Sequence, residues 1–196
     1  MAGYPNHALG AIHGVQGPFF PEAFNPEATM LNAIVYYWMC RYQDSRSELA
    51  NFMEKHSEAV AALNSFLDRK NISEDAAYTL FENVITGVSS ESLGIPRNIL
   101  VMASRKDNML LVRNQFGSVI EEKQLLASKG IFKSLKHTTV PLDYLERWAS
   151  ALRADLGKKY LAELTAIKGD YDRLYQQAQF LYVELLMSEK EQLLVS

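Results

Sequence analysis

The sequence has one cysteine, little net charge and no long apolar run, and each shortage excludes a class of protein. Cys40 alone cannot form an intrachain disulfide, so a disulfide framework is excluded, together with zinc sites that need two or more thiolates. The formal net charge of −3 gives no electrostatic reason to expect a nucleic acid as a partner. No apolar stretch reaches the roughly 18–20 residues that span a bilayer, so we expect no stable membrane insertion.

A secretory signal peptide and the common catalytic motifs are missing too. The first Lys or Arg is Arg41, so we expect that any export uses a route without a Sec-type signal peptide. There is no Gly-rich phosphate loop, no dinucleotide fingerprint, no HExxH and no CxxC. Cys40 lies in the most apolar stretch, where an inert core residue is commoner than a nucleophile. His56 is either a pH-sensitive core residue or a partly exposed polar one. We expect no catalytic residue, cofactor or metal, and hence no enzyme.

What is present is a division of the chain into four segments. The first 26 residues hold four of the six prolines and four of the ten glycines, a density that breaks helices and strands alike. The predicted segments are an irregular N-terminal tail (1–26), a long N-terminal helix (27–70), a middle insertion of short helices and possible short strands (71–140), and a long C-terminal helix (141–193). Within the insertion, Met109–Val112 is the candidate strand.

A heptad repeat predicts the N-terminal helix, which begins near Pro26, a residue suited to the first helical turn. Apolar residues recur there at alternating spacings of four and three, which is the signature of a coiled coil. Neither Gly nor Pro interrupts the segment 27–70. The repeat positions are Leu31, Val35, Trp38, Tyr42, Ser45, Leu49, Phe52, His56, Ala59, Leu63 and Phe66.

The C-terminal helix has two heptad stripes that are out of phase on either side of Gly157, an offset typical of a four-residue stutter. Gly157 and Gly169 each weaken a helix by about 1 kcal/mol relative to Ala, so both need packing support from a partner helix. Phe180 and Met187 are apolar residues that spread beyond the stripe.

These features predict a mainly α fold in which the two terminal helices pair as an antiparallel coiled-coil hairpin. Residues 30–42 are apolar on nearly every side of the helix, and one partner helix covers only one side. The remaining sides need the middle segment, another subunit or a lipid surface, and contact between subunits is favoured. The predicted self-association residues are Leu31, Ile34, Val35, Trp38, Tyr42, Leu49, Phe52, Leu164, Ile167, Tyr171, Leu174, Leu181 and Leu185.

The start of the first helix and part of the middle segment have a residue pattern found in a known family. The stretch AIVYYWMCRYQDS at 33–45 is followed by Leu49 and Phe52 at heptad spacing. The stretch 95–111 combines a Pro-led short helix, a polar turn and a short extended run. Both resemble the type III secretion filament and translocon proteins of the EspA/SseB-like family, and the resemblance extends in organisation over residues 27–192.

The resemblance implies a structural subunit that is exported and then assembles outside the cell into a helical homopolymer. Such a polymer extends the secretion needle and guides effector or translocator delivery to host cells. The implied partners are other copies of the chain, needle and translocator proteins, and a cytosolic secretion chaperone that binds the subunit before export. The implied location is the bacterial surface or the exterior, with a chaperone-bound cytoplasmic pool.

Two other interpretations stay open at the level of sequence. The tail is rich in Pro and Gly where the family is rich in Ser and Thr, so a needle-tip protein or another translocon component fits as well as a filament subunit. From a different class, an intracellular helical binding module, such as a regulator or a secretion chaperone, would also pair an apolar stripe with a partner helix.

Overall fold

The computed structural model describes residues 5–15, 25–68, 72–88, 94–128 and 139–195, and within these ranges every regular element is a helix. The predicted mainly α class is therefore confirmed. The helices are α1 (Pro5–Val15), α2 (Pro26–Trp38), α3 (Tyr42–Leu67), α4 (Glu74–Thr86), α5 (Arg97–Ser104), α6 (Asp107–Ser128) and α8 (Thr139–Val195).

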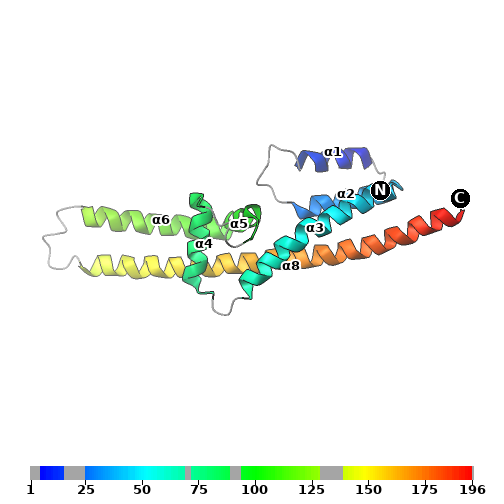
Figure 1. Cartoon of the computed structure of the whole chain (residues 1–196). Helices are drawn as coiled ribbons and strands as arrows, with labels where there is room; N and C mark the ends of the chain where they lie inside the picture. The colour runs from blue at the N-terminus through cyan, green and yellow to red at the C-terminus, as the bar shows by residue number, and fades with distance from the viewer. Residues whose placement is uncertain (1–4, 16–24, 69–71, 89–93, 129–138, 196) are drawn as a thin grey trace.

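Helix α8 is the spine of an elongated molecule (Figure 1). Its 57 residues correspond to about 85 Å at 1.5 Å per residue. Helix α6 packs along its first half, α4 and α5 meet its middle, and α2 and α3 lie along its second half. The opposite ends of α8 therefore contact different parts of the chain.

The crossing of α4 over α8 depends on Gly157. A Cβ atom at this position would overlap the backbone carbonyl of Glu74 in the first turn of α4, so only glycine lets the two helices approach this closely. Ser73 caps that first turn, because its Oγ accepts a hydrogen bond from the amide of Ala76 at 3.1 Å. Gly157 thus has the helix packing expected from the sequence, whereas nothing lies near Gly169 among the described residues.

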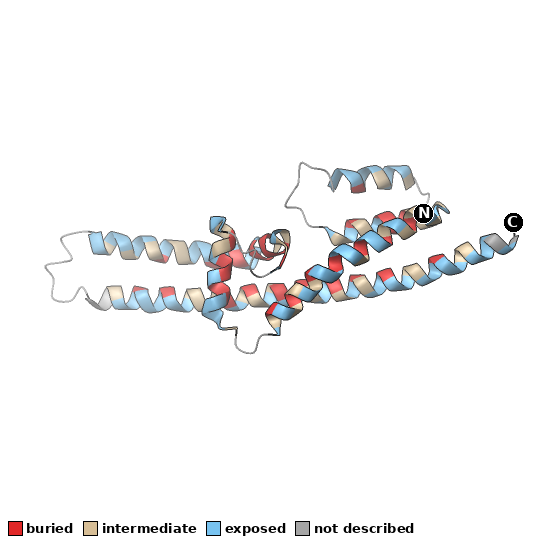
Figure 2. Ribbon diagram, in the orientation of Figure 1, coloured by how far each residue is buried: buried red, intermediate tan, exposed pale blue. Residues whose placement is uncertain are grey.

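Buried side chains concentrate in two places (Figure 2). The larger core surrounds the crossing of α4, α5 and α8. Its centre includes Tyr160, which is fully buried and whose hydroxyl donates a hydrogen bond to the carbonyl of Leu100 at 3.1 Å. The smaller core joins α2, α3 and the second half of α8, and includes Met30, Phe52 and Leu185.

The prediction of one helix over 27–70 is wrong, because the chain turns back between α2 and α3. Cys40 adopts a left-handed conformation with φ 56°. The amide of Arg41 donates to the carbonyl of Tyr36 at 2.9 Å, and that of Cys40 donates to Tyr37 at 3.0 Å. This is the bonding of a Schellman helix end, in which glycine is the usual left-handed residue. The Ser45 hydroxyl then donates to the carbonyl of Ala33 at 2.8 Å, across the hairpin.

Two further expectations need correction. The N-terminal tail is not irregular throughout, because α1 forms over Pro5–Val15 and places Ile12 against Ala28 and Val35 of α2. The remaining tail residues, 1–4 and 16–24, lie outside the described residues. The candidate strand Met109–Val112 is helical and belongs to α6, in which Met109 and Val112 are buried. The spacing of three between Met109 and Val112 fits one face of a helix. The local preference of these residues for a strand is weak, and burial of both side chains outweighs it.

Candidate assembly surface

Most of the predicted self-association residues are buried inside a single chain. Leu49 and Phe52 of α3 pack against α8 in the smaller core. The residues that α8 contributes to its inner face, whether fully or partly buried, are Leu164, Ile167, Tyr171, Leu174, Leu181 and Leu185. Tyr42 packs at the edge of the smaller core, and its ring lies 5.8 Å from that of Tyr37. The predicted stripe is thus real, but intramolecular contacts cover it.

Helix α2 has three apolar faces, and each has different surroundings. Met30 and Ala33 face α3 and α8, while Val35 faces α1. The third face consists of Leu31, Ile34 and Trp38, at spacings of three and four residues. Leu31 is exposed, Ile34 is half-buried, and 69% of Trp38 is exposed. The start of this helix was expected to need partners on several sides. Other helices of the chain cover two of its apolar faces, and the third has no cover among the described residues.

A second apolar stripe runs along the outer face of α8, opposite the side that α3 covers. Phe180, Val183, Met187 and Leu194 follow the spacing of three, four and seven residues. Phe180 is 74% exposed and Met187 is 63% exposed. We call this set the outer stripe, and Leu31, Ile34 and Trp38 the α2 stripe. Phe180 and Met187 stood outside the predicted heptad, and that departure was the signal in the sequence for the outer stripe.

Polar groups fix how α3 and α2 lie on α8. Arg46 forms an ion pair with Glu189 at 3.2 Å, and the hydroxyl groups of Tyr37 and Ser188 lie 3.1 Å apart. Ten residues further along α3, the His56 ring packs against the Tyr171 ring in a tilted arrangement, with 5.3 Å between ring centroids. Contacts that advance along α3 therefore go backward along α8, so the two helices run in opposite directions.

His56 is buried in this seam, with its ring 4.3 Å from the ring of Phe52. Burial lowers the pKa of His56 to about 4, and the nearby Lys55 adds to the lowering. The imidazole is therefore neutral at pH 7. Of the two interpretations of His56, the buried one is correct.

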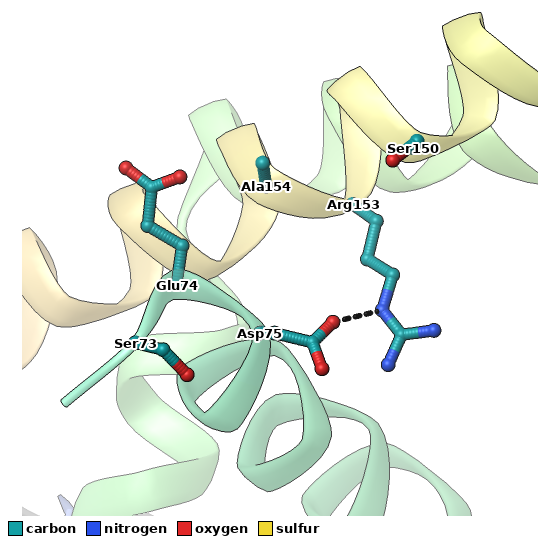
Figure 3. Close-up of a pocket in the computed structure, with 6 residues that line it drawn as sticks. All are labelled: Ser73, Glu74, Asp75, Ser150, Arg153 and Ala154. Atoms are coloured by element: carbon teal, nitrogen blue, oxygen red, sulfur yellow. Dashed lines mark ion pairs between the residues drawn. The ribbon is translucent and has the colours of Figure 1, made fainter.

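The described residues offer few features that could bind a ligand or a metal ion. One shallow hollow lies beside the start of α4 and is lined by Ser73, Glu74, Asp75, Ser150, Arg153 and Ala154 (Figure 3). Its single cation, Arg153, is paired with Asp75 at 2.7 Å and stacks 4.6 Å from the centre of the Tyr78 ring.

No group of three or more His, Cys, Asp or Glu side chains suited to a metal occurs among the described residues. None of the described helices is long and apolar enough to cross a membrane.

Comparison of the chain with family models, with curated proteins and with solved structures gives no match.

Proposed function

We propose that this protein is a structural subunit that assembles with copies of itself through the α2 stripe and the outer stripe. The observation that supports the proposal is the outer stripe, which stays bare after α2 and α3 have covered the inner face of α8. Single exposed apolar residues are ordinary on a protein surface, but a row of large ones on one helix face marks an interaction site. Burying each such side chain contributes roughly 1.5–3 kcal/mol.

The arrangement of the two stripes favours a contact between unlike surfaces, which is the kind of contact that a filament needs. They lie on different helices, and the outer stripe faces away from α3. A contact in which the outer stripe of one copy meets the α2 stripe of the next joins unlike surfaces. Contacts of this heterologous kind produce a ring if the rotation closes and a helical filament if it does not.

Within each subunit we propose that α3 and the second half of α8 act as an antiparallel coiled-coil pair. The residues in their seam follow the heptad repeat, and the ion pair between Arg46 and Glu189 lies at its edge. This pair would remain intact in the polymer, since assembly uses other faces. In this proposal the predicted hairpin of the two terminal helices corresponds to α3 paired with α8, and both stripes lie outside the seam of that pair.

The resemblance to the EspA/SseB-like family supplies the biological setting of the proposal. In that setting the polymer is an extracellular extension of a type III secretion needle, and it contacts needle and translocator proteins. Before export, a cytosolic chaperone would cover the outer stripe and the α2 stripe, because bare apolar faces of this size promote aggregation.

The proposal is tested with purified protein by negative-stain microscopy and sedimentation. We expect filaments that lengthen with protein concentration. Phe180→Asp and Trp38→Asp should each abolish them, because a carboxylate cannot be buried in an apolar contact without a partner. Gln177→Asp is the matched control, since Gln177 is an exposed residue of α8 outside the outer stripe, and this variant should assemble normally.

Two results would contradict the proposal. One is a protein that stays a monomer or a dimer at every concentration, which would favour the binding-module interpretation. The other is assembly that survives both aspartate substitutions. Leu174→Asp is unsuited to this test, because Leu174 is buried in the smaller core and its loss would unfold the subunit.

A further inference from the structure

The turn between α2 and α3 is held by a residue in an unfavourable conformation. Cys40 has φ 56°, in the left-handed region that non-glycine residues rarely adopt. It is exposed, so no surrounding side chains enclose it. A strained backbone of this kind persists only while the packing on either side of it holds, and such positions are common at sites of conformational change.

The sequence across the turn is compatible with a continuous helix. No Gly or Pro occurs between Glu27 and Thr86. The heptad spacing also passes through the turn without a break, because Val35, Trp38, Tyr42 and Ser45 follow one another at three and four residues. If residues 39–41 became helical, α2 and α3 would form one straight helix with a single stripe.

The interactions that α2 makes with its own chain are of a kind that another copy could supply. Met30 and Ala33 rest on α3 and α8, and Tyr37 reaches Ser188. The interface also contains polar groups that limit its strength. Asn32 is only 1% exposed, and its side-chain oxygen has no hydrogen-bond partner among the described residues.

We infer that the surface of α3 and α8 beneath α2 also binds α2 of a second copy, after residues 39–41 straighten into one helix from α2 to α3. The contacts that α2 loses with α3 and α8 of its own chain form again with α3 and α8 of the neighbouring copy. The exchange therefore keeps the number of such contacts the same and releases the backbone strain at Cys40. If each copy donates α2 to the next, the chain of exchanges is open-ended. The inference rests on the proposed self-assembly, to which it adds the way one copy holds the next.

The test uses cross-linking between two single-cysteine chains of full length, both with Cys40→Ser. One chain has Tyr37→Cys and the other has Ser188→Cys, and a short bis-maleimide reports whether α2 of one copy lies on α8 of another. The matched control mixes a chain that has Arg46→Cys with one that has Glu189→Cys. It reports whether α3 of one copy lies on α8 of another, at the residue of α8 next to Ser188. We expect a cross-chain product from the first mixture and none from the second, because α3 stays on its own α8.

Substitutions at position 40 then test the hinge itself. Glycine at 40 removes the strain of the closed turn and weakens the straight helix, so cross-chain product should form about five- to tenfold more slowly than with serine at 40. Valine at 40 should speed it, because a β-branched residue tolerates the left-handed conformation least. Gln43→Gly, at an exposed position of α3 with no turn to relax, should leave the rate unchanged.

The outcomes separate this inference from the proposed function when light scattering is recorded on the same samples. Three results would overturn the exchange of α2. They are assembly without the 37–188 product, equal yields of product from both mixtures, and a rate of product formation that glycine at 40 does not change. Product without any polymer would support the exchange and overturn the filament. The 37–188 product with a fivefold or greater effect of glycine at 40 supports the exchange.

Discussion

The two faces of α8 in its second half carry similar apolar residues but have different surroundings. On the inner face, Leu174 and Leu185 are buried beneath α2 and α3. On the outer face, Phe180 and Met187 are exposed. Among the described residues, only the inner face is covered by other helices of the chain, so the outer face adds little to the core of the monomer. Periodicity thus identifies an apolar face, and only the tertiary structure tells which face stays exposed.

Truncation on each face should give the largest contrast. Leu174→Ala removes buried side-chain atoms and should lower the free energy of unfolding by about 3 kcal/mol. Phe180→Ala should change it by less than about 0.5 kcal/mol, since surface substitutions are usually near neutral. Urea unfolding at a protein concentration below that of assembly measures both. Equal decreases would mean that the outer stripe is covered within the monomer.

The two glycines of α8 sharpen the same comparison. Gly157→Ala places a methyl group on the backbone of α4 and should destabilise the fold by about 2 kcal/mol. Gly169→Ala, on the exposed side with nothing within contact distance, should instead stabilise it by about 0.5–1 kcal/mol. Thermal unfolding of the two variants should shift in opposite directions. A stabilising Gly157→Ala would show that α4 does not pack this closely on α8.

His56 makes the inner face sensitive to acid. Its pKa is lowered to about 4 by burial, below the ordinary value of 6.5, so the unfolded chain binds the proton more readily than the folded chain. Above pH 6.5 the imidazole is neutral in both states, so folding carries no protonation penalty. As the pH falls toward 4, the free energy of unfolding decreases by about 3 kcal/mol. Unfolding measured from pH 4 to 7 should show this slope, and His56→Phe should flatten it. An unchanged slope in that variant would assign the effect to other groups.

The cap of α4 should have the smallest of these effects. Ser73→Ala removes the acceptor for the Ala76 amide and should cost about 1 kcal/mol. Ser65→Ala, an exposed serine inside α3 whose hydroxyl bonds the carbonyl of Ala61, should be neutral or slightly stabilising. Chemical unfolding of this pair tests whether the start of α4 is fixed by its cap. If both variants lost the same stability, contact with α8 alone would position that turn.

Much of the helical structure could be predicted from the sequence, because long apolar periodicity is its strongest signal. The C-terminal helix and the inner face of α8 were predicted in this way, and so was the need of Gly157 for a packing partner. The identity of that partner, α4, could not be predicted, since a helix crossing leaves no mark on local periodicity.

The turn at Cys40 was missed for a physical reason. Helix ends are predicted from Gly and Pro, and neither occurs there. The hairpin forms because α2 buries apolar side chains against α3 and α8, which outweighs the local cost at Cys40. Of the residues predicted for self-association, Leu31 and Trp38 are exposed, whereas those of α3 and α8 face inward. Self-association itself stays a prediction.

The pairing of α3 with the far end of α8 also bears on synthesis of the chain. Arg46 and Glu189 are separated by 143 residues. At the usual ribosomal rate of roughly 5–20 residues per second, α3 waits roughly 7–30 s before its partner has been made. During that interval the apolar sides of α2 and α3 that later contact α8 remain exposed to solvent. The smaller core is therefore completed only when the C-terminal end of α8 has been made, and until then α2 and α3 lack the α8 side chains that they pack against.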